Sequence, residues 1–489
     1  MKKSFIRIAV LFAILITSTN HTKLFPIIYT NKTYMAIPTP HYYLPMKYTS
    51  WHRILKQGSK SEKPWENTLL ATPFYHNSNN EGKLGKYFGT NFKSKLKVSL
   101  PSETTDLQSD NIMHRYDDFP SLDGTLCIKP SHTTYGIYLS YNQELSNIHK
   151  GLFLRVNIPF EHVENDLHAT ATQTKHLGKG ILDFFSGAYS NVDPNNLQDA
   201  LTHAKICGSQ GKSGIADIEL LLGYKLAEKK EHEISGSVKL IIPTGGRPQG
   251  EYLFESVVGN GKHWGIGTNL NASMNIVKNE TSSLECLIFL EYTYLFKSDE
   301  KRTLGFRNGT GLFEGHENTP INIPWFYYIL GGEIGKMGTF PLANILTQEV
   351  SVTPGGKSQG HASFAYHRNN TTIDFGYSFY AQEGERVALK SCWNSSRYAP
   401  ANPSYQTTAA FDVSNTAHSA GQSIKEFELD TSVPETPAFL KHAFHGAISY
   451  THSEWENPFM LGCGFSVDWT HDNANPVGYT LWLKAGATF

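Results

Sequence analysis

The sequence predicts an all-β protein, a single transmembrane antiparallel β-barrel of about 14 strands, with 12 strands as the alternative. Two observations support this fold class. Many segments place apolar residues at every second position, which is the pattern of a strand with one apolar face. The segment 264–276 is also long for a strand of a globular protein, whereas a tilted membrane strand needs about 9–11 residues plus an overhang.

Composition excludes several classes of protein. The chain carries 43 basic and 44 acidic residues, a net charge of −1, so we expect no nucleic-acid partner. A hydrophobic content of 39% fits a barrel better than a helical membrane protein, because only alternate strand residues meet lipid. The 5 cysteines are scattered singly without a CxxC, which argues against a disulfide framework and gives no metal-ligand spacing. We expect no cofactor.

The N-terminus, residues 1–20, has the composition of a secretory signal peptide. Three basic residues precede an apolar run from Ile8 to Ile16, which is too short to span a bilayer as a helix. Cleavage is expected near residues 18–24, and an uncleaved anchor is the alternative. Residues 21–65 are polar and proline-rich and predict an irregular leader. Residues 66–489 form the predicted barrel.

Fourteen segments show the strand alternation. The segment at 326–336 is the least regular and is included partly because a barrel with both ends on one side needs an even number of strands. The predicted strands are 68–76, 134–142, 152–160, 215–225, 233–243, 264–276, 283–296, 326–336, 345–353, 361–368, 371–381, 443–451, 458–469 and 478–489.

The connections between these segments sort by length, as in outer-membrane barrels with short turns on one side and long loops on the other. If both termini lie on the same side, that side receives only short turns, at 143–151, 226–232, 277–282, 337–344, 369–370 and 452–457. The opposite side receives every long connection. Within the long connection at 161–214, the segments 178–187 and 195–206 predict short helices that either cover the mouth or fold into the lumen.

The alternation assigns one face of each strand to the lumen. The polar residues on that face are the candidate lumen-facing residues, namely Arg155, Asp217, Glu219, Lys239, Asn269, Asn271, Glu291 and Asp374. Their charges have mixed signs, so we expect most of them to pair across the lumen and brace it. Aromatic residues near the strand ends predict the interfacial girdles, namely Tyr292, Tyr294, Trp325, Tyr327, Tyr450, Trp455 and Trp469.

The last segment alternates up to a terminal phenylalanine. Its apolar positions include Tyr479, Leu481, Leu483 and Phe489. This ending resembles the C-terminal signal by which bacterial outer-membrane β-barrels are recognised and inserted. The resemblance implies an outer-membrane location, a lipid surround and contact with the barrel-assembly machinery. An edge strand of a soluble β-protein is the alternative.

A second resemblance covers about sixty residues, from IADIELLLGYKL (215–226) and GSVKLIIPTGG (236–246) to the glycines that follow the next loop. These stretches are similar to outer-membrane proteins associated with aromatic-degradation (meta) pathways, which are related in architecture to long-chain fatty-acid transporters. The matching features are Asp217, Gly223-Tyr224, Pro243-Thr244-Gly245, Gly265 and Gly267. The resemblance implies a channel or transporter for small solutes, hydrophobic ones included.

Two other functions stay open at this point. One is a structural or surface-interaction barrel with a plugged lumen; a lumen filled by the helical loops would favour it, and an open lumen would favour transport. The other is an outer-membrane lipid hydrolase, because His76, Ser78 and Asn79 resemble the His-x-Ser-Asn-Gly stretch of outer-membrane phospholipases. Here Asn80 replaces the glycine, and turn chemistry explains the stretch better. We therefore expect no enzyme.

Overall fold

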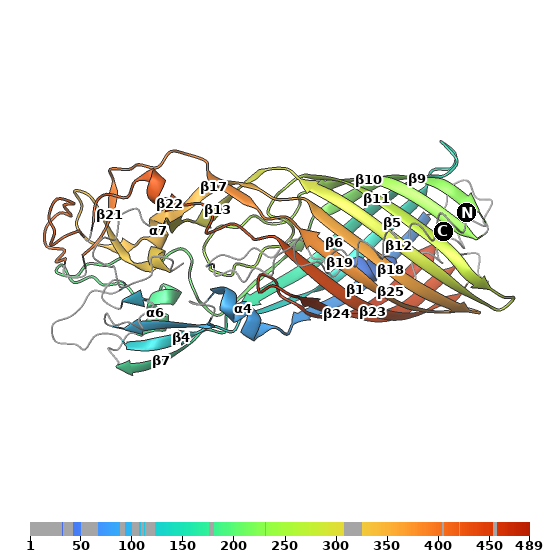
Figure 1. Cartoon of the computed structure of the whole chain (residues 1–489), viewed down its shortest axis with the longest axis horizontal. Helices are drawn as coiled ribbons and strands as arrows, with labels where there is room; N and C mark the ends of the chain where they lie inside the picture. Colours follow the sequence, from blue (N-terminus) through green and yellow to red (C-terminus); the bar gives the residue numbers. More distant parts are fainter. Residues whose placement is uncertain are drawn as a thin grey trace.

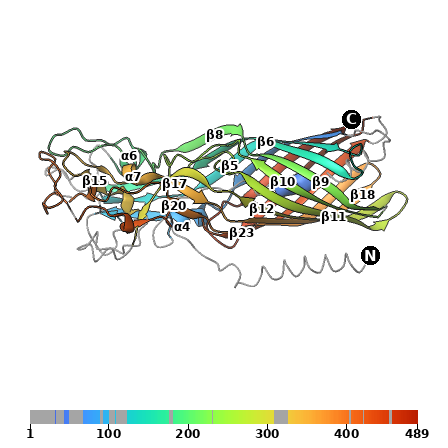
Figure 2. The same cartoon turned by 90° about the horizontal axis from the view of Figure 1, so that it is seen from above.

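The computed structural model shows a long barrel that carries a separate folded region on one end (Figures 1 and 2). We call that region the surface domain, its end of the barrel the capped end, and the opposite end, where Phe489 lies, the C-terminal end. The structure describes residues 32, 43–49, 67–88, 93–99, 107–108, 112, 123–175, 180–229, 231–307, 325–402, 405–419, 421–452 and 457–489. The predicted signal peptide and its cleavage site lie outside these residues.

Twelve antiparallel strands close the barrel. Each strand pairs with the barrel strands that come before and after it in the chain, and the first strand pairs with the last. The strands are β1 (Asn67–Ser78), β5 (Ser131–Glu144), β6 (Leu152–Asp166), β9 (Ile218–Lys229), β10 (His232–Ile242), β11 (Gly265–Lys278), β12 (Ser282–Leu295), β18 (Lys357–Arg368), β19 (Thr371–Gln382), β23 (Phe439–His452), β24 (Phe459–Thr470) and β25 (Gly478–Thr488).

The all-β barrel class is confirmed, and of the two strand numbers that the sequence allowed, the structure has 12. The segments 326–336 and 345–353 lie in the surface domain and not in the barrel wall. The first forms η1 (Phe326–Tyr328), whose three aromatic residues are all buried, and β15 (Leu330–Glu333). The second forms part of α7 (Ala343–Leu346) and β17 (Thr347–Thr353). The apolar residues of β17 alternate because they pack on a protein core. An apolar face with a period of two looks the same in the sequence whether it meets a protein core or lipid.

The connections sort by end as predicted, with one exception. Barrel strands join at the C-terminal end through the short segments 145–151, 230–231, 279–281, 369–370 and 453–458. The predicted turn at 337–344 is not one of them, because it belongs to the surface domain together with its flanking strands. All long connections leave from the capped end, as Figure 1 shows.

One strand continues beyond the barrel wall. β8 (Ser209–Ile215) pairs with β6 above the point where β9 pairs with it. Between the pairs Asn157↔Glu219 and Phe160↔Ile215, the β8–β9 chain has one residue more than β6, which is a β-bulge. Pro159 lies opposite this bulge, where its missing N–H costs nothing, and its carbonyl accepts from Ala216 N at 2.9 Å.

The outer surface of the barrel is apolar. Alternate strand residues that point away from the lumen remain exposed, among them Leu69, Leu222, Val238, Ile266, Ile373, Phe375, Ile448, Leu461, Phe465, Leu481 and Leu483. The four residues of the predicted insertion signal, Tyr479, Leu481, Leu483 and Phe489, are all exposed on this surface. A closed ladder leaves no unpaired strand edge, so such a surface can lie in lipid.

The predicted girdles are confirmed only in part. Tyr292, Tyr294 and Tyr450 are exposed on the outside near strand ends, and Trp469 packs there on Phe444 with ring centroids 4.8 Å apart. The assignment of Trp325 and Tyr327 to a girdle was wrong, because both are buried in the surface domain. Trp455 lies outside the described residues. An aromatic residue near a predicted strand end can belong either to a girdle or to a nearby protein core, and its sequence position does not show which.

The surface domain is built from small sheets that the long connections contribute. One sheet contains β2 (Lys95–Ser99), β3 (Leu107–Gln108), β4 (Asp123–Cys127) and β7 (Thr170–Lys175). The others are formed by β13 (Ser298–Thr303), β17 and β20 (Arg386–Leu389); by β15, β16 (Phe340–Pro341) and β21 (Tyr398–Pro400); and by β14 (Gly305–Phe306) with β22 (Leu429–Asp430). Short helices join them, namely α4 (Glu81–Phe88), α6 (Ile181–Ser186), α7, η1 and η2 (Glu426–Glu428).

Trp325 lies at the centre of the surface-domain core. Its indole N–H donates to Phe88 O at 3.0 Å, its ring stacks on Tyr328 with centroids 5.4 Å apart, and Phe185 meets it edge-on at 5.7 Å. These residues come from three connections that are far apart in the sequence. Burying large aromatic rings from each connection holds the loops together as one body.

One of the two predicted helices in this region is confirmed. The segment 178–187 contains α6, which ends at Gly187 in the left-handed conformation (φ 80°). The segment 195–206 is not helical. Its backbone pairs instead with distant chain, through the bridges of Gln198 to Thr339 and of Lys205 to Tyr252. These tertiary pairings override the local helix preference. Both segments lie in the surface domain.

The described parts of the leader lie in order along the barrel axis. Lys32 is at the capped end, where its backbone N–H donates to Tyr87 O at 2.9 Å and its ammonium donates to Ser432 O at 2.7 Å. Asn67 is at the C-terminal end, paired with Phe489 in both directions at 3.0 and 2.9 Å. Residues 43–49 lie between them, inside the barrel. Residues 43–49 of the leader therefore lie in the lumen.

A buried ion-pair cluster lies where the barrel meets the surface domain. The Arg302 guanidinium donates to Glu300 at 2.8 Å and to Glu385 at 2.6 Å, and the His263 ring contacts Glu300 at 3.0 Å. Burial opposes ionisation of Glu385, but the charge and hydrogen bond of Arg302 outweigh it and lower the pKa of that carboxyl. Arg302 also donates to Pro434 O at 2.7 Å, so the cluster joins β13 to the chain that leads into β23.

Arg302→Met should destabilise the surface domain, by about 3–5 kcal/mol, because it leaves two buried carboxylates without their cation. The contribution of the pair is present above the ordinary pKa of 4.5 and is lost as pH falls through the lowered pKa of Glu385. The measurement is the temperature at which trypsin cuts the surface domain, with the barrel followed by heat-modifiable migration on a gel. Lys390→Met, which breaks an exposed pair with Asp299 in the same domain, is the control. Equal effects of the two variants would contradict the prediction.

Candidate functional site

The interior of the barrel is lined by polar side chains from the inward positions of its strands. Of the eight candidate lumen residues, Arg155, Asp217, Lys239, Asn269, Glu291 and Asp374 are buried, and Glu219 and Asn271 are half-buried. They occupy positions opposite in alternation to the exposed apolar residues. A polar interior of this kind needs partners for its charges, because the surrounding wall screens them less than water does.

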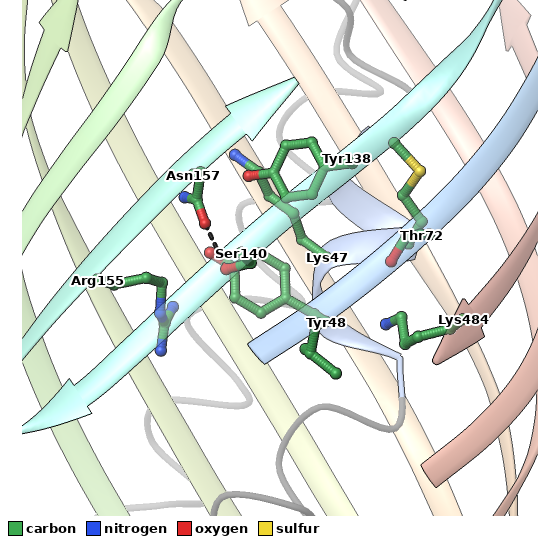
Figure 3. Close-up of a pocket in the computed structure, with 10 residues that line it drawn as sticks. Lys47, Tyr48, Thr72, Tyr138, Ser140, Arg155, Asn157 and Lys484 are labelled. Atoms are coloured by element: carbon green, nitrogen blue, oxygen red, sulfur yellow. Dashed lines mark hydrogen bonds between the residues drawn. The ribbon is translucent and has the colours of Figure 1, made fainter. Parts of the chain in front are cut away.

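A short helix of the leader occupies this interior. α2 (Tyr43–Tyr48) carries Pro45 in its first turn, where a missing backbone N–H is tolerated. We call residues 43–49 the plug. Its Tyr43 and Met46 form a small buried cluster with Phe74, Tyr138 and Trp482 of the barrel wall. Figure 3 shows the plug side chains Lys47 and Tyr48 among the wall residues. The leader, predicted to be irregular, therefore contains a helix that the wall stabilises.

An alternating chain of charges fixes the plug to the wall. Lys47 of the plug donates to Glu219 at 2.7 Å, and Lys239 lies 3.6 Å from the same carboxylate. Lys239 also pairs with Glu291, which accepts from Gln359 at 2.6 Å. Each buried carboxylate thus has a cation within hydrogen-bonding range, which offsets the cost of removing it from water. The predicted residues Glu219, Lys239 and Glu291 meet here, as cross-lumen pairing implies.

The two ends of the plug have their own contacts. At one end, the Tyr43 hydroxyl donates to Glu161, a carboxylate that also accepts from Gly259 N at 3.3 Å. At the other end, Lys484 donates to the carbonyl of Thr49 at 2.5 Å. The Tyr48 ring stacks on Phe289 of β12, with centroids 4.0 Å apart. The plug is therefore held entirely by side-chain contacts with the wall, within the described residues.

The other predicted lumen residues lie apart from this charge chain. Asn269 accepts from Ser237 at 2.6 Å, and the Arg155 guanidinium lies over the Phe153 ring at 5.7 Å. Asp217 lies at the bulge, where a Cβ on Gly259 would come within 2.9 Å of its carboxylate; that close approach requires the glycine, whose φ is +79°. Asp374 and Asn271 also lie outside the chain of pairs.

Two small cavities flank the Tyr48 side chain. One, of about 20 Å³, is lined by Lys47, Tyr138, Ser140, Asn157 and Lys484 among others. The second, of about 60 Å³, is lined by Glu233, Ser235, Ser273, Phe289 and His361 among others. Arg155 borders both cavities. A single water needs roughly 10–15 Å³ of such volume, so these spaces hold a few waters at most. These two spaces beside Tyr48 are therefore too small for a solute.

The hydrolase motif does not assemble in this structure. The Ser78 hydroxyl accepts from the backbone N–H of His132 at 2.8 Å. The His76 ring instead shares a hydrogen bond with the Thr480 hydroxyl at 3.0 Å. Asn79 is in the turn that follows, where its N–H donates to Val477 O at 2.8 Å. None of the described hydrogen bonds joins the serine to the histidine, so this geometry offers no activated nucleophile.

Sequence reasoning missed several residues of the site. Lys47, Tyr43 and Tyr48 lie in the leader, which has no strand alternation, so no pattern placed them in the lumen. An available signal was the apolar run YYLPM at 42–46, although the leader has a second such run, LFPII at 24–28. The wall residues Asn157 and Glu161 follow the same inward alternation as Arg155, and a full list of inward polar positions on β6 would have included them.

Comparison with known proteins gives no family model that matches and no curated protein that matches. Among solved structures, the chain resembles an outer membrane channel from Pseudomonas putida F1, with 9% identity, 88% of this chain and 97% of that chain covered, and a TM-score of 0.36. It also resembles the TodX monoaromatic hydrocarbon channel (9%, 88% and 90%, 0.33) and a FadL homologue from Pseudomonas aeruginosa (6%, 87% and 89%, 0.27). TM-scores below 0.5 do not carry the functions of those proteins over to this chain.

Glu219→Gln should loosen the plug, because it leaves Lys47 without its carboxylate. The readout is the rate at which a charged maleimide labels a cysteine placed at Ser140, a residue beside Tyr48, after the exposed Cys207, Cys392 and Cys463 are replaced by serine. We expect labelling at least about tenfold faster, which corresponds to about 1.4 kcal/mol. The matched control is Glu144→Gln, which breaks a similarly buried pair with Lys225 at 3.1 Å, away from the plug. An unchanged labelling rate in Glu219→Gln would contradict the assigned role.

In the part of the chain that the structure describes, no helix is long and apolar enough to cross a membrane. The strands form a closed ladder with an apolar exterior, aromatic residues near the strand ends and a polar interior that a segment of the leader fills. These properties are those of an outer-membrane β-barrel. The chain is therefore a β-barrel of the bacterial outer membrane.

Proposed function

We propose that the protein is a channel or transporter that passes small solutes across the bacterial outer membrane, with the plug as its gate. One observation carries this proposal: the lumen is filled by a separate segment that contacts the wall through side chains and makes no strand pairs with it. Side-chain contacts can break and re-form without opening the barrel. Solutes that the resemblance implies, hydrophobic ones included, would find the rings of Phe289, Tyr138 and Trp482 along this path.

The wall itself supports a transport role over a purely structural one. A barrel that is permanently closed would be at least as stable with an apolar interior, since replacing buried ion pairs by well-packed apolar residues is often neutral or stabilising. Here the wall keeps Glu219, Lys239 and Glu291 around the plug. If the plug leaves, Lys239 still pairs with Glu291, and the polar wall then suits water and solute.

A surface-interaction role is the second candidate, and one observation favours it: the surface domain has its own aromatic core around Trp325. The described residues of 178–187 and 195–206, the two segments predicted as helices, lie in that domain and do not fill the lumen. We also propose that the barrel is not an enzyme, since Ser78 and His76 bond to different partners. The exposed terminal residues of β25 remain available for the assembly machinery, which we propose as a partner.

Replacing residues 43–49 by a glycine-serine linker of equal length should open the channel. Single-channel recording in a planar bilayer should show rare or no current steps for the unaltered protein and frequent steps for the linker variant. Met46→Leu, which conserves volume in the same segment, is the control and should behave as the unaltered protein does. A linker variant that shows heat-modifiable migration, and is therefore folded, but passes no current would contradict the gating proposal.

A further inference from the structure

One side of the lumen carries buried polar groups that the closed protein leaves unpaired. We call it the imidazole–hydroxyl patch; it consists of His361, Ser363, His445, Ser449 and Ser466 on the inward faces of β18, β23 and β24. Within the described residues, three of its hydroxyls, both ring nitrogens of His445 and Nε2 of His361 have no hydrogen-bond partner. All of these atoms are buried, and His361 also lines the cavity of about 60 Å³ beside Tyr48.

The patch is compact because three of its residues share one row across the sheet. Ser363 is paired with Gly376, Gly376 with His445, and His445 with Ser466. The His361 ring stacks on the His445 ring, with centroids 4.6 Å apart and planes 15° from parallel. The Tyr48 ring of the plug lies 5.7 Å from that of His361. Flat aromatic faces and hydroxyls therefore line the lumen side by side, next to the plug.

The closed state does not explain these groups. A buried donor or acceptor without a partner destabilises the protein, and native structures rarely keep several together. On the opposite wall, Glu219, Lys239 and Asn157 have partners. Single atoms of Asn142 and Asn269 there lack one among the described residues, so the patch differs by having five such residues on β18, β23 and β24. Groups that are unpaired while the plug is in place are best explained by a partner that is present when the plug is displaced.

We propose that the imidazole–hydroxyl patch is the solute-binding wall of the open channel and that it binds cyclic solutes with several hydroxyl groups, such as saccharides. This inference rests on the proposed channel function. Serine hydroxyls both donate and accept, and a neutral imidazole offers one donor and one acceptor, so the patch complements a hydroxylated ring. Asp374 of β19, paired with Ala365 and Ala447, lies between His445 and Ser449, and a carboxylate there also accepts hydrogen bonds from solute hydroxyls. The imidazole faces supply a flat surface on which the less polar face of such a ring stacks.

The test uses single channels of the variant in which a linker replaces residues 43–49. Maltotriose added to one side should produce transient blockades of the current. Ser363→Ala and Ser466→Ala should each shorten the mean blockade by about three- to tenfold, the range expected for one hydrogen bond. The control is Ser140→Ala on the opposite wall, whose hydroxyl already donates to Asn157 at 2.5 Å, and it should leave the blockade unchanged.

The possible outcomes separate this inference from the channel proposal. Current steps without maltotriose blockades would overturn the inference and leave the channel standing, as would blockades by indole, a ring without hydroxyls, in place of maltotriose. Equal effects of Ser140→Ala and Ser466→Ala would also overturn it. If the folded variant passes no current, equilibrium dialysis of labelled maltotriose against it decides: binding that Ser363→Ala and Ser466→Ala weaken supports the patch, and no binding overturns it.

Discussion

Closure of the strand ladder is the constraint on which the rest of the structure depends. In lipid, every backbone N–H and C=O must find a partner inside the protein, so the pairing of β1 with β25 is required for the barrel to exist there. The period of two then sends alternate side chains to lipid and to the lumen. Leu481 and Leu483 are exposed for that reason, and Lys484 is buried for the same reason.

A closed barrel of this size also encloses an interior that side chains, water or another segment must fill. The chain fills it with its own leader, whose Lys47 extends the charge series Glu219–Lys239–Glu291 by one cation. The same series that satisfies the wall therefore also holds the plug. Lys32 is fixed at the capped end and Asn67 at the C-terminal end, so the plug lies between two fixed points of the chain.

Alternation and loop length predicted the barrel class and which strand residues point inward or outward, because these follow from local spacing. They did not distinguish β17 from a membrane strand, since Val350 and Val352 alternate against a protein core as they would against lipid. Nor could they place Tyr43–Tyr48 in the lumen or predict that 195–206 bridges to Tyr252, because both depend on contacts with distant chain. The stacking of the His361 ring on the His445 ring across β19 could likewise not be predicted without the strand register.

The central claim is that the plug is a movable segment held in place by the Glu219 carboxylate. Amide hydrogen exchange measured over residues 43–49 tests it most directly, with the strand amides of β1 and β25 as an internal reference. Exchange of the plug should be faster in Glu219→Gln than in the unaltered protein or in Glu144→Gln, while the strand amides stay protected in all three. Plug amides that exchange as slowly as the strand amides in every variant would contradict the account.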